Sequence, residues 1–409
     1  MAVERLTASD PAAAAAAVRA LVPTGSSVAG AVREVLEQVR DGGDAAICAL
    51  EERFTGVRPV GLRVSEPALE DALSALDRPV RDALELARRN VDTVARSGLA
   101  GDRVIDLPQG QRITLREVPV RRAAVYAPGG QAPYPSSIVM GVATARAAGV
   151  AEVAVCATHP VMQAAAALCG ADEVYAMGGA QAVAAFAFGT ESVAPVDVIV
   201  GPGSLYAQEA KRQVFGRVGI DGFAGPSDLV VIATPGADPA QVALDALGQA
   251  EHGAGSVVAV VATDAALLAD VAARTGNPEP ALLALVRVPD VEAALAFSEA
   301  FAPEHLQLCG TEAEALAPRV TAAGCVFVGA AAGTAYGDYV AGSNHVLPTE
   351  GAARFASGLG VRHFRRTMNV VEIGPEAAAA LAPAGAAIAH AEGFTAHAAS
   401  MEARMDGRT

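Results

Sequence analysis

The chain has 409 residues, enough for two or three domains, and its composition of 52% hydrophobic and 18% charged residues excludes a disordered protein. Lys and Arg number 30 against 45 Asp and Glu, so the net charge of −15 disfavours nucleic acid or an anionic membrane surface as a partner. The five cysteines are scattered and form no C-x-x-C pair, which favours a reducing cytoplasm over a disulfide framework or a thiolate zinc site. The uncharged stretch 123–145 is interrupted by prolines and glycines, so it is not predicted to span a membrane.

The first part of the chain is predicted to be helical. After a tail and helix in 1–25, apolar residues keep helical spacing through 26–54, with a break at Gly42 and Gly43, and again through 65–99. We expect this N-terminal part, residues 26–119, to be structural and to pack on the second of two α/β domains.

Beyond residue 120 the pattern changes to short apolar runs separated by alanine-rich helices. Such runs lie at 123–127, 152–157, 173–177, 196–201, 228–234, 256–263 and 325–329. Strands that are apolar throughout predict parallel sheets covered on both faces. The predicted fold class is therefore α/β, with two parallel-sheet domains at 120–225 and 226–372 and a helical C-terminal tail at 373–409. In such folds the chemistry is expected in loops at the carboxyl ends of the strands.

Three glycine-rich segments, 126–137, 178–181 and 201–206, each follow a predicted strand and precede a predicted helix. The first is equally compatible with ligand binding and with a turn that caps a helix. The third, GPGSLY, has the first two glycines of a dinucleotide fingerprint, but Tyr206 occupies the place of the third. Backbone N–H groups at such a helix N-terminus still suit a phosphate. Lys211, the only lysine, is predicted to form a surface salt bridge.

Two pairs of residues suit metal or acid–base chemistry. Gln249 and His252 lie three residues apart on one face of a predicted helix, a spacing that could serve a metal but more often belongs to a capping or core histidine. Glu304 and His305 adjoin at a helix-to-strand junction, where a carboxylate and an imidazole suit proton transfer. A helix-start glutamate beside a surface histidine is the simpler alternative.

Further polar residues lie in the segment 225–228, in the long loop 337–349, and in the tail. In the tail His390 and His397 share a helix face, and geometry alone does not choose between them. Because no thiolate cluster competes, a zinc ion with histidine, aspartate and glutamine ligands is the natural metal prediction.

Eight motifs then occur in order between Tyr126 and His397: YAPGGQAPYPSS, GGAQAVAAFAFGTE, VDVIVGPG, VGIDGFAGPSD, QAEH, APEHL, GDYVAGSNHVLPT and EGFTAHA. Each is weak alone, but together they resemble the histidinol dehydrogenase family. The resemblance implies a homodimer whose subunits each contain two incomplete Rossmann-like domains. It also implies oxidation of L-histidinol to L-histidine through histidinal, with zinc and two NAD, as the last steps of histidine biosynthesis.

The resemblance assigns roles to individual residues. His305 would be the general base for the redox steps, and Glu304 would activate the water that attacks the aldehyde. One zinc ion per subunit would be held by Gln249, His252, Asp338 and His397, which selects His397 over His390. The implied NAD contacts are Tyr126, Gln181 and Ser204. The implied substrate contacts are Ser227, Gln249, His252, His305, Asp338, Glu392 and His397, of which Glu392 and His397 would act in the partner's site.

The sequence departs from the usual pattern of the family in four places. Ser204 stands where asparagine is common, Gly253 where aspartate is common, and Ser343 where proline is frequent, and the segment 264–284 is shorter than usual. One alternative is a relative that oxidises another small polar alcohol with zinc and NAD. A second is a zinc hydrolase in which Glu304 and His305 activate water, although three glycine-rich loops disfavour it. The last is a catalytically silent paralogue.

Overall fold

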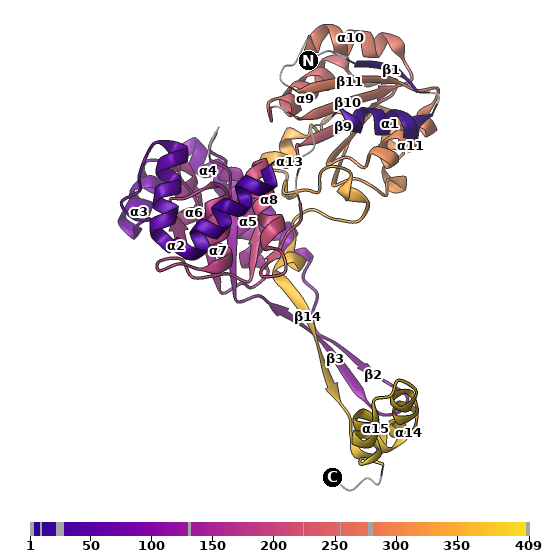
Figure 1. The fold of residues 1–409 in the computed structure, drawn as a ribbon. Helices are drawn as coiled ribbons and strands as arrows, with labels where there is room; N and C mark the ends of the chain where they lie inside the picture. The colour runs from indigo at the N-terminus through magenta and orange to yellow at the C-terminus, as the bar shows by residue number, and fades with distance from the viewer. Residues whose placement is uncertain are drawn as a thin grey trace. The chain divides into compact units, whose positions relative to one another are not determined.

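The computed structural model describes residues 4–8, 10–21, 28–129, 132–223, 225–253, 255–276 and 281–405. They form two compact units (Figure 1). The larger unit comprises Met1–Gly98 and Val120–Phe364, and the smaller unit comprises Leu99–Pro119 and Arg365–Thr409. Several predicted segments fall partly outside the described residues: the N-terminal tail at 1–3, 9 and 22–27, the first glycine-rich loop at 130–131, and the shortened segment at 277–280.

The first sheet of the larger unit is parallel, with strand order β6-β5-β4-β7-β8. Its strands are β4 (Arg122–Tyr126), β5 (Glu152–Cys156), β6 (Glu173–Tyr175), β7 (Val198–Val200) and β8 (Gly219–Ile220), joined by α5 (Pro135–Ala147), α6 (Pro160–Cys169), α7 (Gly179–Phe188) and α8 (Leu205–Val214). The chain runs outward from β4 to β6 and then returns to place β7 on the other side of β4. The direction of winding therefore switches between β4 and β7, where open α/β sheets bind ligands.

The second sheet is also parallel, with order β1-β11-β10-β9-β12-β13. Its strands are β1 (Glu4–Thr7), β9 (Asp228–Ala233), β10 (Val257–Ala262), β11 (Leu282–Arg287), β12 (His305–Cys309) and β13 (Cys325–Val328). One face packs on α1 (Pro11–Ala20) and α11 (Val291–Phe301), and the other on α9 (Pro239–Ala250) and α10 (Ala265–Thr275). These four helices begin at aspartates whose side chains accept backbone N–H groups of the first turn: Asp10, Asp238, Asp264 and Asp290.

The N-terminal helices pack on the first sheet, not on the second as predicted. Apolar residues of α2 (Ala29–Thr55) share a core with α7 and α8, and those of α4 (Arg78–Ser97) share a core with α5 and α6. The helix α3 (Glu66–Ser74) adds Leu69 to the α4 side. By contrast, β1 and α1, predicted only as a tail and helix, belong to the second sheet. Helical periodicity identifies an apolar face but does not say which sheet that face covers.

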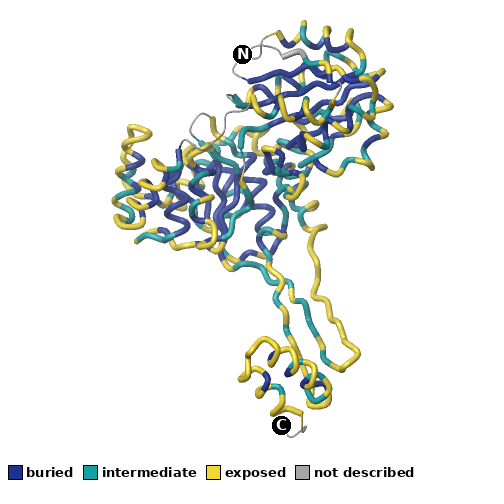
Figure 2. The backbone as a smooth tube through the Cα atoms, turned by 45° about the vertical axis from the view of Figure 1, so that its right-hand side comes forward, coloured by how far each residue is buried: buried dark blue, intermediate teal, exposed yellow. Residues whose placement is uncertain are grey.

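The smaller unit contains an antiparallel sheet with order β14-β3-β2. The strands β2 (Arg103–Asp106), β3 (Arg112–Pro119) and β14 (Arg365–Glu372) are accompanied by α14 (Pro375–Ala391) and α15 (Thr395–Glu402). The predicted boundaries are therefore wrong here, since 99–119 was assigned to the helical part and 365–372 to the second α/β domain. These strands are exposed or half-buried, as Figure 2 shows, so they lack the apolar runs that marked the parallel strands.

The predicted α/β class with two parallel sheets and helical extensions is confirmed. The remaining helices are α12 (Thr311–Glu314), α13 (Ala335–Tyr339) and the short 3-10 turns Ala317–Arg319, Ala352–Arg354 and Val361–Phe364. In the part of the chain that the structure describes, no helix is long and apolar enough to cross a membrane.

Candidate active site

The predicted acid–base pair Glu304 and His305 lies at the amino end of β12, as the predicted helix-to-strand junction implied, although loop chemistry in general was expected at the carboxyl ends of strands. Ser227 directly precedes β9, Glu304 directly precedes β12, and the two strands are neighbours. Ala302 ends α11 in a left-handed conformation with φ 49°, so the chain turns sharply into the strand. Gly324 then passes so close that a Cβ there would lie 2.6 Å from the carbonyl oxygen of Glu304. Backbone turns, rather than a helix N-terminus, bring these side chains together.

A chain of hydrogen bonds joins four of the predicted site residues. The imidazole Nδ1 of His252 lies 3.1 Å from the carbonyl oxygen of Gln249, Gln249 Nε2 donates to Ser227 Oγ at 2.6 Å, and Ser227 Oγ donates to Glu304 Oε2 at 2.5 Å. A carbonyl only accepts, so Nδ1 of His252 is the donor, and in the neutral imidazole Nε2 keeps its lone pair available for a ligand. The amide of Gln249 likewise turns its oxygen away from Ser227. The two atoms left available, an imidazole nitrogen and an amide oxygen, are of the kinds that bind zinc.

Glu304 is a buried carboxyl with a strongly raised pKa. Burial, followed by the nearby Asp228 carboxylate, raises the pKa of Glu304 to about 8, although hydrogen bonds from Ser227 and the Asp228 N–H oppose the shift. Asp228 also accepts the backbone N–H of Glu304 at 2.7 Å and pairs with Arg19 of α1 at 2.5 Å. A carboxyl with this pKa exchanges a proton near neutral pH. The contribution of Arg19 was not predicted, because nothing in the pattern around residue 19 distinguishes it from other helix arginines.

His305 lies beside Glu304 with both ring nitrogens buried and, among the described residues, without a hydrogen-bond partner. Its Nδ1 is 3.7 Å from Glu304 Oε2 and its Nε2 is 3.8 Å from Asp338 Oδ1. Burial lowers the pKa of His305, and the carboxylates of Asp338 and Asp228 oppose that shift. A neutral, unpartnered imidazole can accept a proton from a ligand, and buried orphan nitrogens are what a bound polar ligand would satisfy.

The loop that carries Asp338 is anchored by buried polar contacts. His345 Nδ1 lies 2.8 Å from the carbonyl oxygen of Asp338, and His345 Nε2 lies 3.0 Å from Ser137 Oγ on α5. Asn344 donates to the Met140 carbonyl oxygen of α5 at 3.2 Å. The sequence patterns assigned no role to His345, although it lies within one of the eight motifs. These contacts hold Asp338 near His305.

The predicted NAD contacts gather around the winding switch of the first sheet. Tyr126 ends β4, and its hydroxyl accepts the Gly179 N–H at 3.2 Å, while Gln181 is buried in the first turn of α7. Ser204 precedes α8 and is exposed, with no capping hydrogen bond from its side chain. A Cβ at Gly201 would lie 1.9 Å from the carbonyl oxygen of Tyr126, so the loop after β7 passes β4 more closely than any side chain allows.

Lys211 is not on the surface as predicted. Its side chain is 1% exposed, it pairs with Asp221, and it donates to the Gly201 carbonyl oxygen at 2.9 Å. Asp221 in turn accepts the Gly201 N–H at 2.6 Å. The only lysine therefore fixes the loop between β7 and α8 from inside the protein.

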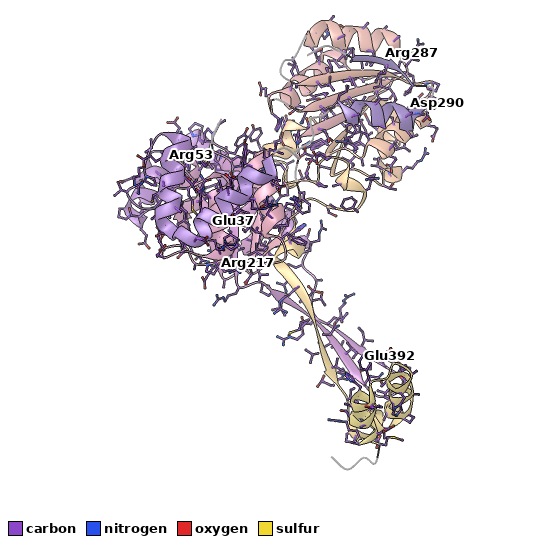
Figure 3. The ribbon with its side chains drawn as sticks, in the orientation of Figure 1. Glu37, Arg53, Arg217, Arg287, Asp290 and Glu392 are labelled. Atoms are coloured by element: carbon purple, nitrogen blue, oxygen red, sulfur yellow. The ribbon has the colours of Figure 1, made fainter. Side chains whose placement is uncertain are left out.

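Glu392 and His397 belong to the smaller unit, whereas Gln249, His252 and Asp338 belong to the larger unit. Glu392, labelled in Figure 3, ends α14, and His397 lies on α15; both are exposed. Across the described ranges of one chain, no group of three or more His, Cys, Asp or Glu residues could hold a metal ion. The donor types suit zinc, but the predicted ligand set is not assembled from the larger unit alone.

Comparison with known proteins gives one consistent family. Residues 23–405 match the family described as histidinol dehydrogenase. The chain belongs to the histidinol dehydrogenase family. It is 42% identical to histidinol dehydrogenase of Thermobifida fusca over 397 residues, covering 91% of each chain, and 41% identical to that of Rhodopseudomonas palustris, covering 94% of each. The crystal structure of histidinol dehydrogenase from Elizabethkingia anophelis aligns with a TM-score of 0.92 at 28% identity, covering 99% of this chain and 98% of that one. The prediction of an oxidoreductase of this family is confirmed.

Proposed function

We propose that the protein oxidises L-histidinol to L-histidine through histidinal, using zinc and two NAD, in the last steps of histidine biosynthesis. The observation that carries the proposal is the hydrogen-bonded chain from His252 through Gln249 and Ser227 to Glu304, with His305 unpartnered beside it. This arrangement prepares two metal-binding atoms and two proton acceptors in one place. We expect the enzyme to act in the cytoplasm, in line with its five free thiols.

His305 and Glu304 divide the proton transfers. His305, neutral because burial lowers its pKa, accepts the hydroxyl proton of the alcohol during the first oxidation. Glu304, in its ionised form, takes a proton from the water that adds to the aldehyde; its pKa of about 8 makes it a stronger base than an exposed glutamate. Ser227 keeps the carboxylate oriented through its 2.5 Å hydrogen bond.

Gln249, His252 and Asp338, with His397 as the fourth ligand, would hold the zinc ion. When bound, zinc orients the imidazole and amine of the substrate and so supplies mainly positioning. The Ser227–Gln249 bond and the His252–carbonyl bond present Oε1 and Nε2 as the coordinating atoms. NAD, when bound near Tyr126, Gln181 and Ser204, accepts the electrons of each oxidation.

We propose that the enzyme is a homodimer in which Glu392 and His397 complete the partner's site. The smaller unit supports this idea because its buried core is little more than a few alanines of α14 and α15. It also exposes large apolar side chains, namely Val104, Ile105, Leu107, Val371, Ile373, Ile388 and Phe394. A three-stranded sheet with so little of its own core gains stability from another chain.

The proposal is tested by supplying purified protein with zinc, NAD and L-histidinol. We expect about two NADH per histidinol consumed, because two successive two-electron oxidations are required. NADH formation with another small polar alcohol but not with histidinol would favour the relative with a different substrate. Hydrolysis without NAD would favour the zinc hydrolase.

A further inference from the structure

We propose that Glu51 is a positioning residue that fixes the amide of Gln181 for NAD binding. The inference rests on the proposed role of Gln181 as an NAD contact. Glu51 lies on α2, in the N-terminal helical part to which the sequence assigned only a structural role. Its side chain is buried, and its Oε1 accepts the Gly178 N–H at 2.8 Å and Gln181 Nε2 at 3.0 Å. One carboxylate oxygen therefore holds both the turn before α7 and the side chain in its first turn.

The contact decides which way the amide of Gln181 points. Gln181 Nε2 donates to Glu51 Oε1, so the NH2 group of Gln181 faces Glu51 and its carbonyl oxygen points elsewhere. Gly179 provides the space for that oxygen, because a Cβ at residue 179 would lie 2.7 Å from Gln181 Oε1. Gly179 also has φ +59°, which a glycine adopts readily. The amide is thus constrained on both sides before any ligand binds.

The same turn also contacts Tyr126, the other predicted NAD contact, which lies at the end of β4. The Tyr126 hydroxyl accepts the Gly179 N–H at 3.2 Å, next to the Gly178 N–H that Glu51 accepts. Both predicted contacts therefore depend on one backbone turn. A change at Glu51 is expected to alter NAD affinity through this turn without touching Glu304 or His305, which belong to the second sheet.

The side chain of Glu51 is thus shared between the backbone turn and Gln181, since one oxygen accepts hydrogen bonds from both.

The test compares Glu51→Leu, Glu51→Gln, Gln181→Leu and the double variant Glu51→Leu/Gln181→Leu. The dissociation constant of NADH is measured from its own fluorescence without substrate, a convenient signal in a chain without tryptophan. The KM for NAD, kcat and thermal unfolding are measured in parallel. Glu52→Gln, on the exposed side of the same helix, is the matched control.

We expect Glu51→Leu and Gln181→Leu each to weaken NADH binding about tenfold, with kcat at saturating NAD changed by less than about twofold. Glu51→Gln retains an oxygen acceptor and is expected to stay within about threefold of the wild type. The double variant should bind NADH more tightly than the two single losses combined would give, because both substitutions remove the shared Glu51–Gln181 hydrogen bond.

Three outcomes would overturn the proposal. If Glu51→Leu lowers the unfolding temperature but leaves NADH affinity unchanged, its role is structural only. If the two single effects add in the double variant, Glu51 does not act through Gln181. If Gln181→Leu binds NADH normally, the role of Gln181 in the proposed function fails, and the inference about Glu51 fails with it. The two failures can be told apart. Normal NADH affinity in Gln181→Leu contradicts the proposed role of Gln181, whereas reduced affinity in Gln181→Leu with normal affinity in Glu51→Leu contradicts only the role of Glu51.

Discussion

Hydrogen bonds select the tautomer of two histidines and the amide orientation of one glutamine before any metal binds. Backbone carbonyls fix the proton on Nδ1 of both His252 and His345, and Ser227 orients the amide of Gln249. Ligands held in the required tautomer lose less entropy when they coordinate a metal. Residues that never touch the metal are therefore expected to influence its binding.

His252→Ala is expected to lose bound zinc, because it removes a nitrogen ligand. Ser227→Ala is expected to weaken zinc binding by about tenfold although Ser227 is not a ligand, since the amide of Gln249 is then free to turn. Zinc content after dialysis against a graded chelator measures both effects. His159→Ala, which changes a helix-capping histidine, serves as the control and should retain the metal. Full zinc occupancy in His252→Ala would remove this residue from the ligand set.

Glu304 also makes stability depend on pH. Its pKa is raised from 4.5 to about 8, so between these values the folded protein holds a proton that the unfolded chain has lost. The free energy of unfolding should therefore fall as pH rises through this interval. Urea unfolding of the metal-free protein at about pH 5.5 and about pH 8.5 should show a smaller decrease for Glu304→Gln than for the wild type. The exposed variant Glu312→Gln should keep the wild-type decrease; equal pH slopes for all three proteins would contradict the assignment.

At the scale of elements, the buried Lys211–Asp221 pair connects α8 to the loop that follows β7. Lys211 holds the carbonyl group of Gly201, and Asp221 holds its N–H. These contacts hold the loop from within the protein. Lys211, the only lysine of the chain, therefore helps to fix the conformation of this loop. It is too deeply buried to form the surface salt bridge that was predicted.

Lys211→Met is expected to lower the free energy of unfolding by about 3–5 kcal/mol, because Asp221 is then left buried without a cation. Adding Asp221→Asn should restore much of that loss, since the amide oxygen still accepts the Gly201 N–H and carries no charge. Equilibrium unfolding in urea compares the three proteins. A double variant no more stable than Lys211→Met would show that charge burial is not the cause.

The elements that could be predicted are those whose signal is local. The buried parallel strands show as continuous apolar runs, and Glu304 with His305 are adjacent in the sequence. Arg19 and Asp228 are 209 residues apart, so no spacing rule could pair them. The antiparallel strands β2, β3 and β14 have no buried face, so burial does not impose on their sequences the alternation of apolar and polar residues by which such strands are predicted. The helix-to-strand position of Glu304 and His305 was predicted, but the turns at Ala302 and Gly324 that shape it were not, because no local pattern specifies them.

At the scale of the whole molecule, one chain divides the predicted zinc ligands between its two units. Gln249, His252 and Asp338 come from the larger unit and His397 from the smaller unit. The smaller unit has little core of its own and exposes apolar side chains. In the proposed homodimer, closed two-fold symmetry would let each copy provide His397 to the site of its partner.

Mixed dimers of His305→Asn and His397→Ala test this arrangement. Each homodimer is expected to be inactive, since each of its sites has one defect. If the tail acts in the partner's site, every mixed dimer has one site with both defects and one with neither, so an equal mixture that exchanges subunits freely should regain roughly a quarter of wild-type activity. The control mixture of His305→Asn with His252→Ala places both defects in the larger unit and should regain nothing. Activity that stays absent in the first mixture, although mixed dimers are detected by mass, would show that His397 serves its own chain.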